Sequence, residues 1–101
     1  MLERDYQMRL IRKIRRRIPG CYVLKNDSGY QQGIPDLLVI HGDQWAMLEV
    51  KPRKPRGPED FEPNQEWFIE EFDRMSFGAC IYPANEEEVL NDLQQLFHSR
   101  R

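Results

Sequence analysis

The sequence predicts a single α/β domain in which a mixed four-stranded sheet is flanked by helices, in the order α-β-β-β-α-β-α. The chain of 101 residues has the size of one domain with one core. Segments with a helical apolar period alternate with short apolar segments of strand length. A Gly-Asp pair separates two of these short segments and predicts a β-hairpin in the sheet.

The first half of the chain predicts one helix and one short strand before the hairpin. Apolar residues recur at four-residue steps and predict a helix over residues 2–17, which Pro19-Gly20 ends. Residues 21–25 predict a strand, and a polar loop with two glycines follows over 26–33.

The hairpin is predicted from two apolar strands, residues 35–41 and 44–51, joined by Gly42-Asp43. Both strands are apolar at consecutive positions. We therefore expect them in the centre of the sheet, with both faces covered.

The second half predicts a β-α-β unit and a last helix. Four prolines make residues 52–63 a loop, after which the apolar period predicts a helix over 64–75. A strand over 79–82 and a helix over 85–97 follow. The crossover helix implies that its two strands are parallel.

Composition excludes several classes of protein. No apolar run reaches the ~20 residues of a membrane span, and residues 1–17 lack the apolar core of a signal peptide. We therefore expect a cytoplasmic, intracellular protein. Cys21 and Cys80 are predicted to be reduced core thiols, because neither has the partners that a zinc site needs.

Charge is distributed unevenly along the chain. Residues 1–56 hold 12 Lys and Arg against 6 Asp and Glu, and residues 57–101 hold 3 against 11. The first part therefore has a local net charge of +6, although the whole chain has a net charge of -2. This pattern predicts one basic face for phosphates, or else acidic helices that are simply solvated.

The hairpin register gathers three charged residues on one face. With Gly42-Asp43 as the turn, Asp36 faces Glu49 across the strands at a Cβ separation of about 4.5–5.5 Å. Lys51 lies two residues beyond Glu49 and thus on the same face. The rest of this face is predicted to be core, namely Leu38, Ile40, Trp45 and Met47.

Two opposed carboxylates in a half-buried sheet repel unless a cation binds between them. Oxygen ligands at this spacing suit Mg²⁺ or Mn²⁺, with the backbone carbonyl of Val50 as a further ligand. The competing interpretation is that Glu49 and Lys51 form an ordinary ion pair. The central strand and the opposed Asp36 favour the metal site.

These residues resemble a known nuclease signature. Gly33-Ile34-Pro35-Asp36 followed by Glu49-Val50-Lys51 resembles the PD-(D/E)XK motif, and more closely its VRR-NUC branch with small stand-alone viral and prophage members. The resemblance implies a restriction-endonuclease-like fold and a single VRR-NUC-like domain over residues 1–101, of phage or prophage type. It also implies that Asp36 and Glu49 bind the metal and that Lys51 is the catalytic lysine.

Two further positions follow from the same resemblance. Glu3 corresponds to the acid of the N-terminal helix, and Gln65 to the glutamine of the helix after the hairpin. The alternative is that Glu3 is a solvated helix residue and Gln65 a polar surface residue.

Basic side chains near these positions are candidates for nucleic-acid binding, with a generic charged surface as the alternative. They are Arg53, Lys54 and Arg56 after the catalytic lysine, Arg12, Lys13, Arg15, Arg16 and Arg17 on the first helix, and Lys25 before the loop. The neutral amide of Asn26 is a further candidate.

The sequence thus predicts a Mg²⁺- or Mn²⁺-dependent endonuclease. The resemblance implies branched DNA as substrate, with Holliday junctions as the most specific candidate. Symmetric cutting of two strands implies a homodimer. Two alternatives stay open. One is a nuclease of the same fold on nicked, linear or single-stranded DNA, in phage replication or packaging. The other is a DNA-binding subunit without catalysis.

Overall fold

A computed structural model describes residues 2–98, and its elements follow the predicted order. Two 3-10 turns, which the sequence did not predict, lie before α2 and α3. The elements are α1 (Glu3–Arg17), β1 (Tyr22–Lys25), β2 (Leu37–His41), β3 (Gln44–Val50), η1 (Pro58–Asp60), α2 (Gln65–Met75), β4 (Gly78–Ile81), η2 (Pro83–Asn85) and α3 (Glu86–His98).

The four strands form one mixed sheet in the order β1-β2-β3-β4. The β1–β2 and β2–β3 pairs are antiparallel, and β3–β4 is parallel as the crossover predicts. His41 pairs with Gln44, and Leu37 with Leu48, so the predicted hairpin register is confirmed. Gly42 turns the chain at φ +64°, a left-handed conformation that favours glycine.

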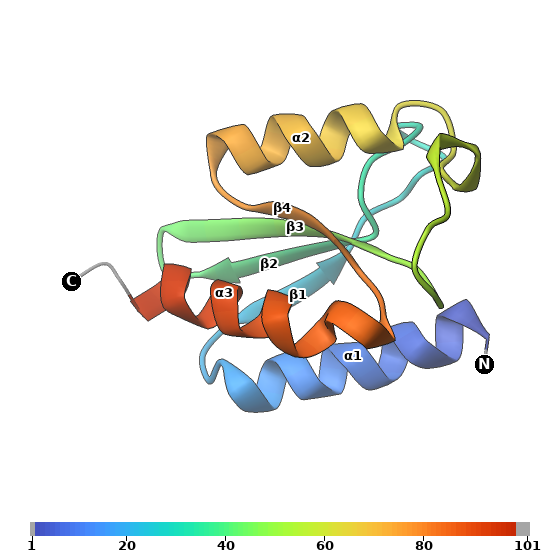
Figure 1. Cartoon of the computed structure of the whole chain (residues 1–101). Helices are drawn as coiled ribbons and strands as arrows, with labels where there is room; N and C mark the ends of the chain where they lie inside the picture. The colour runs from blue at the N-terminus through green and yellow to red at the C-terminus, as the bar shows by residue number, and fades with distance from the viewer. Residues whose placement is uncertain (1, 99–101) are drawn as a thin grey trace.

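Helices α1 and α3 cover one face of the sheet and α2 covers the other (Figure 1). The fully buried core lies on the α1 and α3 side, where alternate strand residues meet both helices. Its central members are Tyr6, Leu10 and Ile14 of α1, Leu37, Val39, Leu48 and Val50 of the sheet, and Leu90, Leu93 and Phe97 of α3.

The α2 face is packed less completely. Among its residues, α2 has none that is fully buried, and Leu38, Ile40 and Trp45 of the strands beneath are only half-buried. The prediction that these three residues are core is therefore wrong. They line an apolar groove of about 440 Å³ together with Phe72 and Met75. One helix cannot cover four strands, and α2 packs mainly over β3 and β4.

The junction between α2 and β4 depends on Gly78, which begins the strand one residue before the predicted bound. A Cβ here would lie 2.4 Å from the carbonyl oxygen of Ile69, so only glycine lets the helix backbone approach so closely. Cys21 and Cys80 are free thiols, both half-buried. Across residues 2–98, no helix is long and apolar enough to cross a membrane.

Candidate active site

Asp36 immediately precedes β2. Leu37 pairs with Leu48, and the same register extended by one residue pair sets Asp36 opposite Glu49. Its Oδ2 accepts a hydrogen bond from the Val50 amide at 2.8 Å, and its carbonyl accepts one from the Asn26 amide at 2.9 Å. The first bond holds the carboxylate from β3, and the second holds the Asp36 backbone from the residue that follows β1. Asn26 also donates its side-chain Nδ2 to the Pro35 carbonyl at 2.8 Å. The structure therefore gives Asn26 a role in holding the Asp36 segment.

Glu49 is the most deeply buried acid that the structure describes, with 2% of its surface exposed. Its Oε2 accepts a hydrogen bond from Gln65 Nε2 at 2.9 Å and lies 3.6 Å from Lys51 Nζ. Its Oε1 is the one buried side-chain oxygen or nitrogen among residues 2–98 with no hydrogen-bond partner. An orphaned carboxylate oxygen is costly unless another group satisfies it.

Gln65, the first residue of α2, joins the acid to the lysine. Its Oε1 accepts a hydrogen bond from Lys51 Nζ at 3.3 Å and another from the Glu62 amide at 2.8 Å. The Gln65 amide group is thus hydrogen-bonded to both Glu49 and Lys51 and orients the two side chains. Lys51 Nζ also lies 5.3 Å from the centre of the Phe61 ring, a cation–π contact.

The backbone beside Gln65 is held by a contact that the sequence does not reveal. Gly33 has φ +88°, and a Cβ there would lie 2.6 Å from the Pro63 carbonyl oxygen and from Asn64 Cβ. Asn64 itself has φ +74°. The loop that leads to Asp36 therefore packs directly on the start of α2, which positions both sides of the site relative to one another.

Glu3 lies at the start of α1, where its electrostatic neighbours are Asp36, Lys51 and Glu62. Burial raises the pKa of Glu3, and the Asp36 charge adds to the shift. The structure thus brings the N-terminal acid to the edge of the site, although its side chain is exposed. Glu62 and Phe61 also border the site, and neither was predicted, because the proline-rich loop has no periodicity to place them.

The electrostatics of the acid pair favour a bound cation. Burial, and then the Asp36 carboxylate, raise the pKa of Glu49 to about 8, while Lys51 opposes the shift. Burial also raises the pKa of Asp36, against the Val50 amide, Lys51 and a side-chain hydrogen bond that Glu49 can donate only when it is protonated. Both carboxylates are therefore poorly compensated when charged, because one lysine cannot neutralise the buried Glu49 and the half-buried Asp36 together.

The donor set fits a hard divalent cation. Asp36 and Glu49 supply carboxylate oxygens, and Glu49 Oε1 lacks a partner. Within residues 2–98, no group of three or more His, Cys, Asp or Glu side chains is arranged to hold a metal ion, so the protein offers two carboxylates here. A cation here would therefore keep several water ligands, as Mg²⁺ does in most protein sites.

Basic residues border the site on the loop after β3. A hollow of about 200 Å³ is lined by Glu3, Lys51 and the loop residues Arg53, Lys54 and Arg56. Arg56 is tied to Asp60 by three hydrogen bonds of 2.8 to 3.1 Å. Arg53 and Lys54 are both exposed beside the same hollow.

The remaining predicted nucleic-acid residues lie away from this hollow. Lys25 ends β1 and is exposed, and its charge acts on Asp36. The basic residues of α1 do not act as one group. Lys13 and Arg17 bond to α3, whereas Arg12, Arg15 and Arg16 are exposed.

The fold is similar to that of a solved nuclease. The structure of Hjc from Archaeoglobus fulgidus, a Holliday junction resolvase from an archaeal hyperthermophile, superposes with a TM-score of 0.52 and 14% sequence identity. The match covers 78% of this chain and 67% of that one. No protein-family model and no curated protein matches the chain. The comparison shows the fold alone: this chain has the mixed-sheet, restriction-endonuclease-like architecture of Hjc.

Proposed function

We propose that this protein is a Mg²⁺- or Mn²⁺-dependent endonuclease that hydrolyses phosphodiester bonds in branched DNA, with Holliday junctions as the leading substrate. The observation that carries the proposal is the buried Glu49, which has one unpartnered oxygen and lies opposite Asp36 and beside Lys51. A protein that only binds DNA does not need two poorly compensated acids at that position.

In this proposal Asp36, Glu49 and the carbonyl of Val50 hold the cation, with Glu3 at the open side. A bound Mg²⁺ or Mn²⁺ lowers the pKa of a water ligand and neutralises charge on the phosphoryl oxygens. Lys51 supplies a fixed positive charge for the developing negative charge at phosphorus. Gln65 holds the Lys51 amine and the Glu49 carboxylate in position through one hydrogen bond to each.

The fold of Hjc and the Gly-Ile-Pro-Asp and Glu-Val-Lys segments support the choice of substrate and of family. We assign residues 1–101 to one VRR-NUC-like nuclease domain within the PD-(D/E)XK superfamily. In this proposal Arg53 and Lys54, which line the hollow beside Lys51, contact phosphates next to the scissile bond. Two cuts across a four-way junction require two such sites, so we propose a two-fold homodimer.

The test compares cleavage of a labelled four-way junction and of its component duplex in Mg²⁺, Mn²⁺ or EDTA. Asp36→Asn and Lys51→Ala should each lower the cleavage rate by about 10³-fold, because each removes a charge used in the transition state. Asp92→Asn is the matched control, since Asp92 is an exposed acid of α3. It should cut at the wild-type rate.

The outcomes separate the alternatives. Metal-dependent cutting of the junction alone supports the proposal. Cutting of the duplex, or of nicked or single-stranded DNA, at the same rate retains the nuclease and removes the selectivity. Binding without cutting in any metal would leave a non-catalytic DNA-binding subunit.

A further inference from the structure

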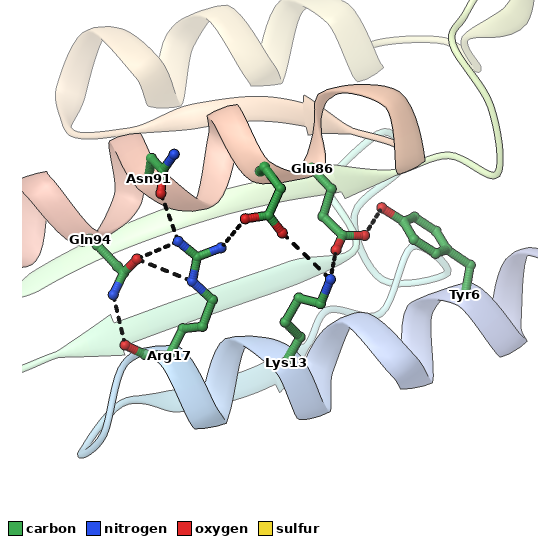
Figure 2. Close-up of polar contacts among 7 residues, drawn as sticks. Tyr6, Lys13, Arg17, Glu86, Asn91 and Gln94 are labelled. Atoms are coloured by element: carbon green, nitrogen blue, oxygen red, sulfur yellow. Dashed lines mark hydrogen bonds and ion pairs between the residues drawn. The ribbon is translucent and has the colours of Figure 1, made fainter.

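The basic side chains of α1 fall into two sets that face different surroundings. Lys13 and Arg17 point to α3 and form a polar seam with it (Figure 2). Lys13 bonds to Glu86 and lies 3.6 Å from Glu87. Arg17 donates to Glu87 at 2.8 Å, and to Asn91 and Gln94 on the next turns of α3. The charges of this set are used within the protein.

The second set points to solvent. Arg9, Arg12 and Arg16 are exposed and recur at steps of three and four residues, which places them on one face of the helix. No carboxylate of residues 2–98 lies within ion-pair distance of Arg12 or Arg16. The three arginines, with Lys13 and Glu86, line a hollow of about 400 Å³ beside the seam. We call these three residues the α1 arginine stripe.

The length of the stripe along α1 matches a run of successive phosphates on a DNA duplex. At about 1.5 Å per residue, Arg9 to Arg16 covers about 10 Å, and Arg16 lies about 20 Å along the axis from Glu3 beside the active site. A duplex rises about 3.4 Å per base pair, so this reach corresponds to about six base pairs. A straight helix of 15 residues is a rigid support, which matches a duplex better than a flexible single strand.

We propose that the α1 arginine stripe binds the phosphate backbone of one duplex arm of the substrate, from about three to about six base pairs from the scissile bond. This inference rests on the proposed nuclease function, and it names the part of the substrate that this surface reads. Arg9, which the sequence did not single out, belongs to the stripe, while Lys13 and Arg17 do not. Asp5, exposed one turn before Arg9, ends the stripe on the side of the active site.

The first measurement is the salt dependence of binding to a four-way junction in EDTA, by fluorescence anisotropy between about 50 and about 200 mM salt. The slope of log K against log salt is negative, and each lost phosphate contact reduces its absolute value by about 0.9. Arg16→Gln should reduce this value by that amount, and the triple variant Arg9→Gln, Arg12→Gln, Arg16→Gln by nearly three times as much. Asp5→Asn should tighten binding.

Arg74→Gln is the matched control. Arg74 is an exposed arginine of α2, paired with Glu71, on the opposite side of the sheet, so its loss removes the same charge without touching the stripe. Its slope should equal that of the wild type. Equal slopes for the triple variant and the wild type would overturn the proposal, as would an equal loss in Arg74→Gln.

A second measurement tests the arm itself. Junctions with arms of about four and about twelve base pairs are shorter and longer than the reach of the stripe. The wild type should bind the longer arms at least tenfold more tightly, and the triple variant should lose most of this gain. An equal gain from single-stranded extensions would overturn the choice of duplex.

Cleavage in Mg²⁺ keeps the two proposals separate. If the triple variant binds like the wild type while the wild type cuts junctions, the stripe is wrong and the nuclease stands. If the variant loses the slope but no protein cuts DNA, the stripe stands as a binding surface and the nuclease is wrong.

Discussion

The two faces of the sheet differ in how completely they are packed. On the α1 and α3 face, Leu37, Leu48 and Val50 are fully buried against two helices. On the α2 face, Leu38, Ile40 and Trp45 are half-buried, and α2 contributes no fully buried residue. The first face supplies most of the buried apolar surface and hence the stability. The second face is more open, and the charged cluster of Asp36, Glu49 and Lys51 lies at its end.

Two buried glutamates show the same contrast. Glu86, between α1 and α3, accepts hydrogen bonds from Tyr6 at 2.9 Å and from Lys13 (Figure 2). Although burial opposes the shift, these bonds lower the pKa of Glu86. Glu49 has an unpartnered oxygen, and burial and Asp36 raise its pKa to about 8. The α1 and α3 face stabilises the charge of Glu86 with its own hydrogen bonds. On the α2 face, the charge of Glu49 is left to be stabilised by a ligand.

The largest effect expected from this contrast comes from two neighbouring leucines on β2. Leu37→Ala should lower the free energy of unfolding by about 3 kcal/mol, because it opens a cavity in a closed core. Leu38→Ala should cost less than half as much, since its side chain already borders an open groove. Urea unfolding of both variants gives the comparison. Equal losses would mean that the two faces contribute equally to stability.

The next effect is a pH dependence that belongs to Glu49. Its folded pKa of about 8 lies above the unfolded value of 4.5, so the folded state binds more protons between these values. Unfolding free energy in EDTA should therefore fall by more than ~1 kcal/mol as pH rises from about 6 to about 8. Glu49→Gln should flatten this decline, as should saturating Mg²⁺ with the wild type. A wild-type stability that stays level over this range would contradict the prediction.

The smallest effect has the opposite sign and comes from Glu86. Its folded pKa is lowered, so its contribution is present above the unfolded value of 4.5 and is lost as pH falls through the folded value. Glu86→Gln should lower stability at neutral pH by about 1 kcal/mol, because it weakens hydrogen bonds to a charged group, and should reduce the loss in acid. Thermal unfolding at pH values on both sides of 4.5 tests this.

The hairpin could be predicted from the sequence because its determinants are local. A two-residue turn with glycine fixes the register, and the register alone sets Asp36 opposite Glu49. The apolar periods likewise predicted the three helices and the order of helices and strands along the chain.

What the sequence could not show depends on contacts between distant segments. Periodicity cannot tell that Lys13 and Arg17 bond to α3 while Arg12 and Arg16 face solvent. Nor does it predict that α2 leaves part of the sheet open. Gln65 was identified by resemblance, but its bonds to Glu49 and Lys51 follow from the packing of Gly33 on the start of α2.

The hairpin register also bears on how the site forms during folding. Asp36 and Glu49 are separated by few residues, and most of these pair in the two strands. The entropy needed to bring the acids together is therefore small, since it grows with the logarithm of loop length. Gln65 and Glu3 join only when α2 and α1 dock from farther along the chain. The acid pair can thus assemble early with its hairpin, and the groups that orient it arrive with the tertiary structure.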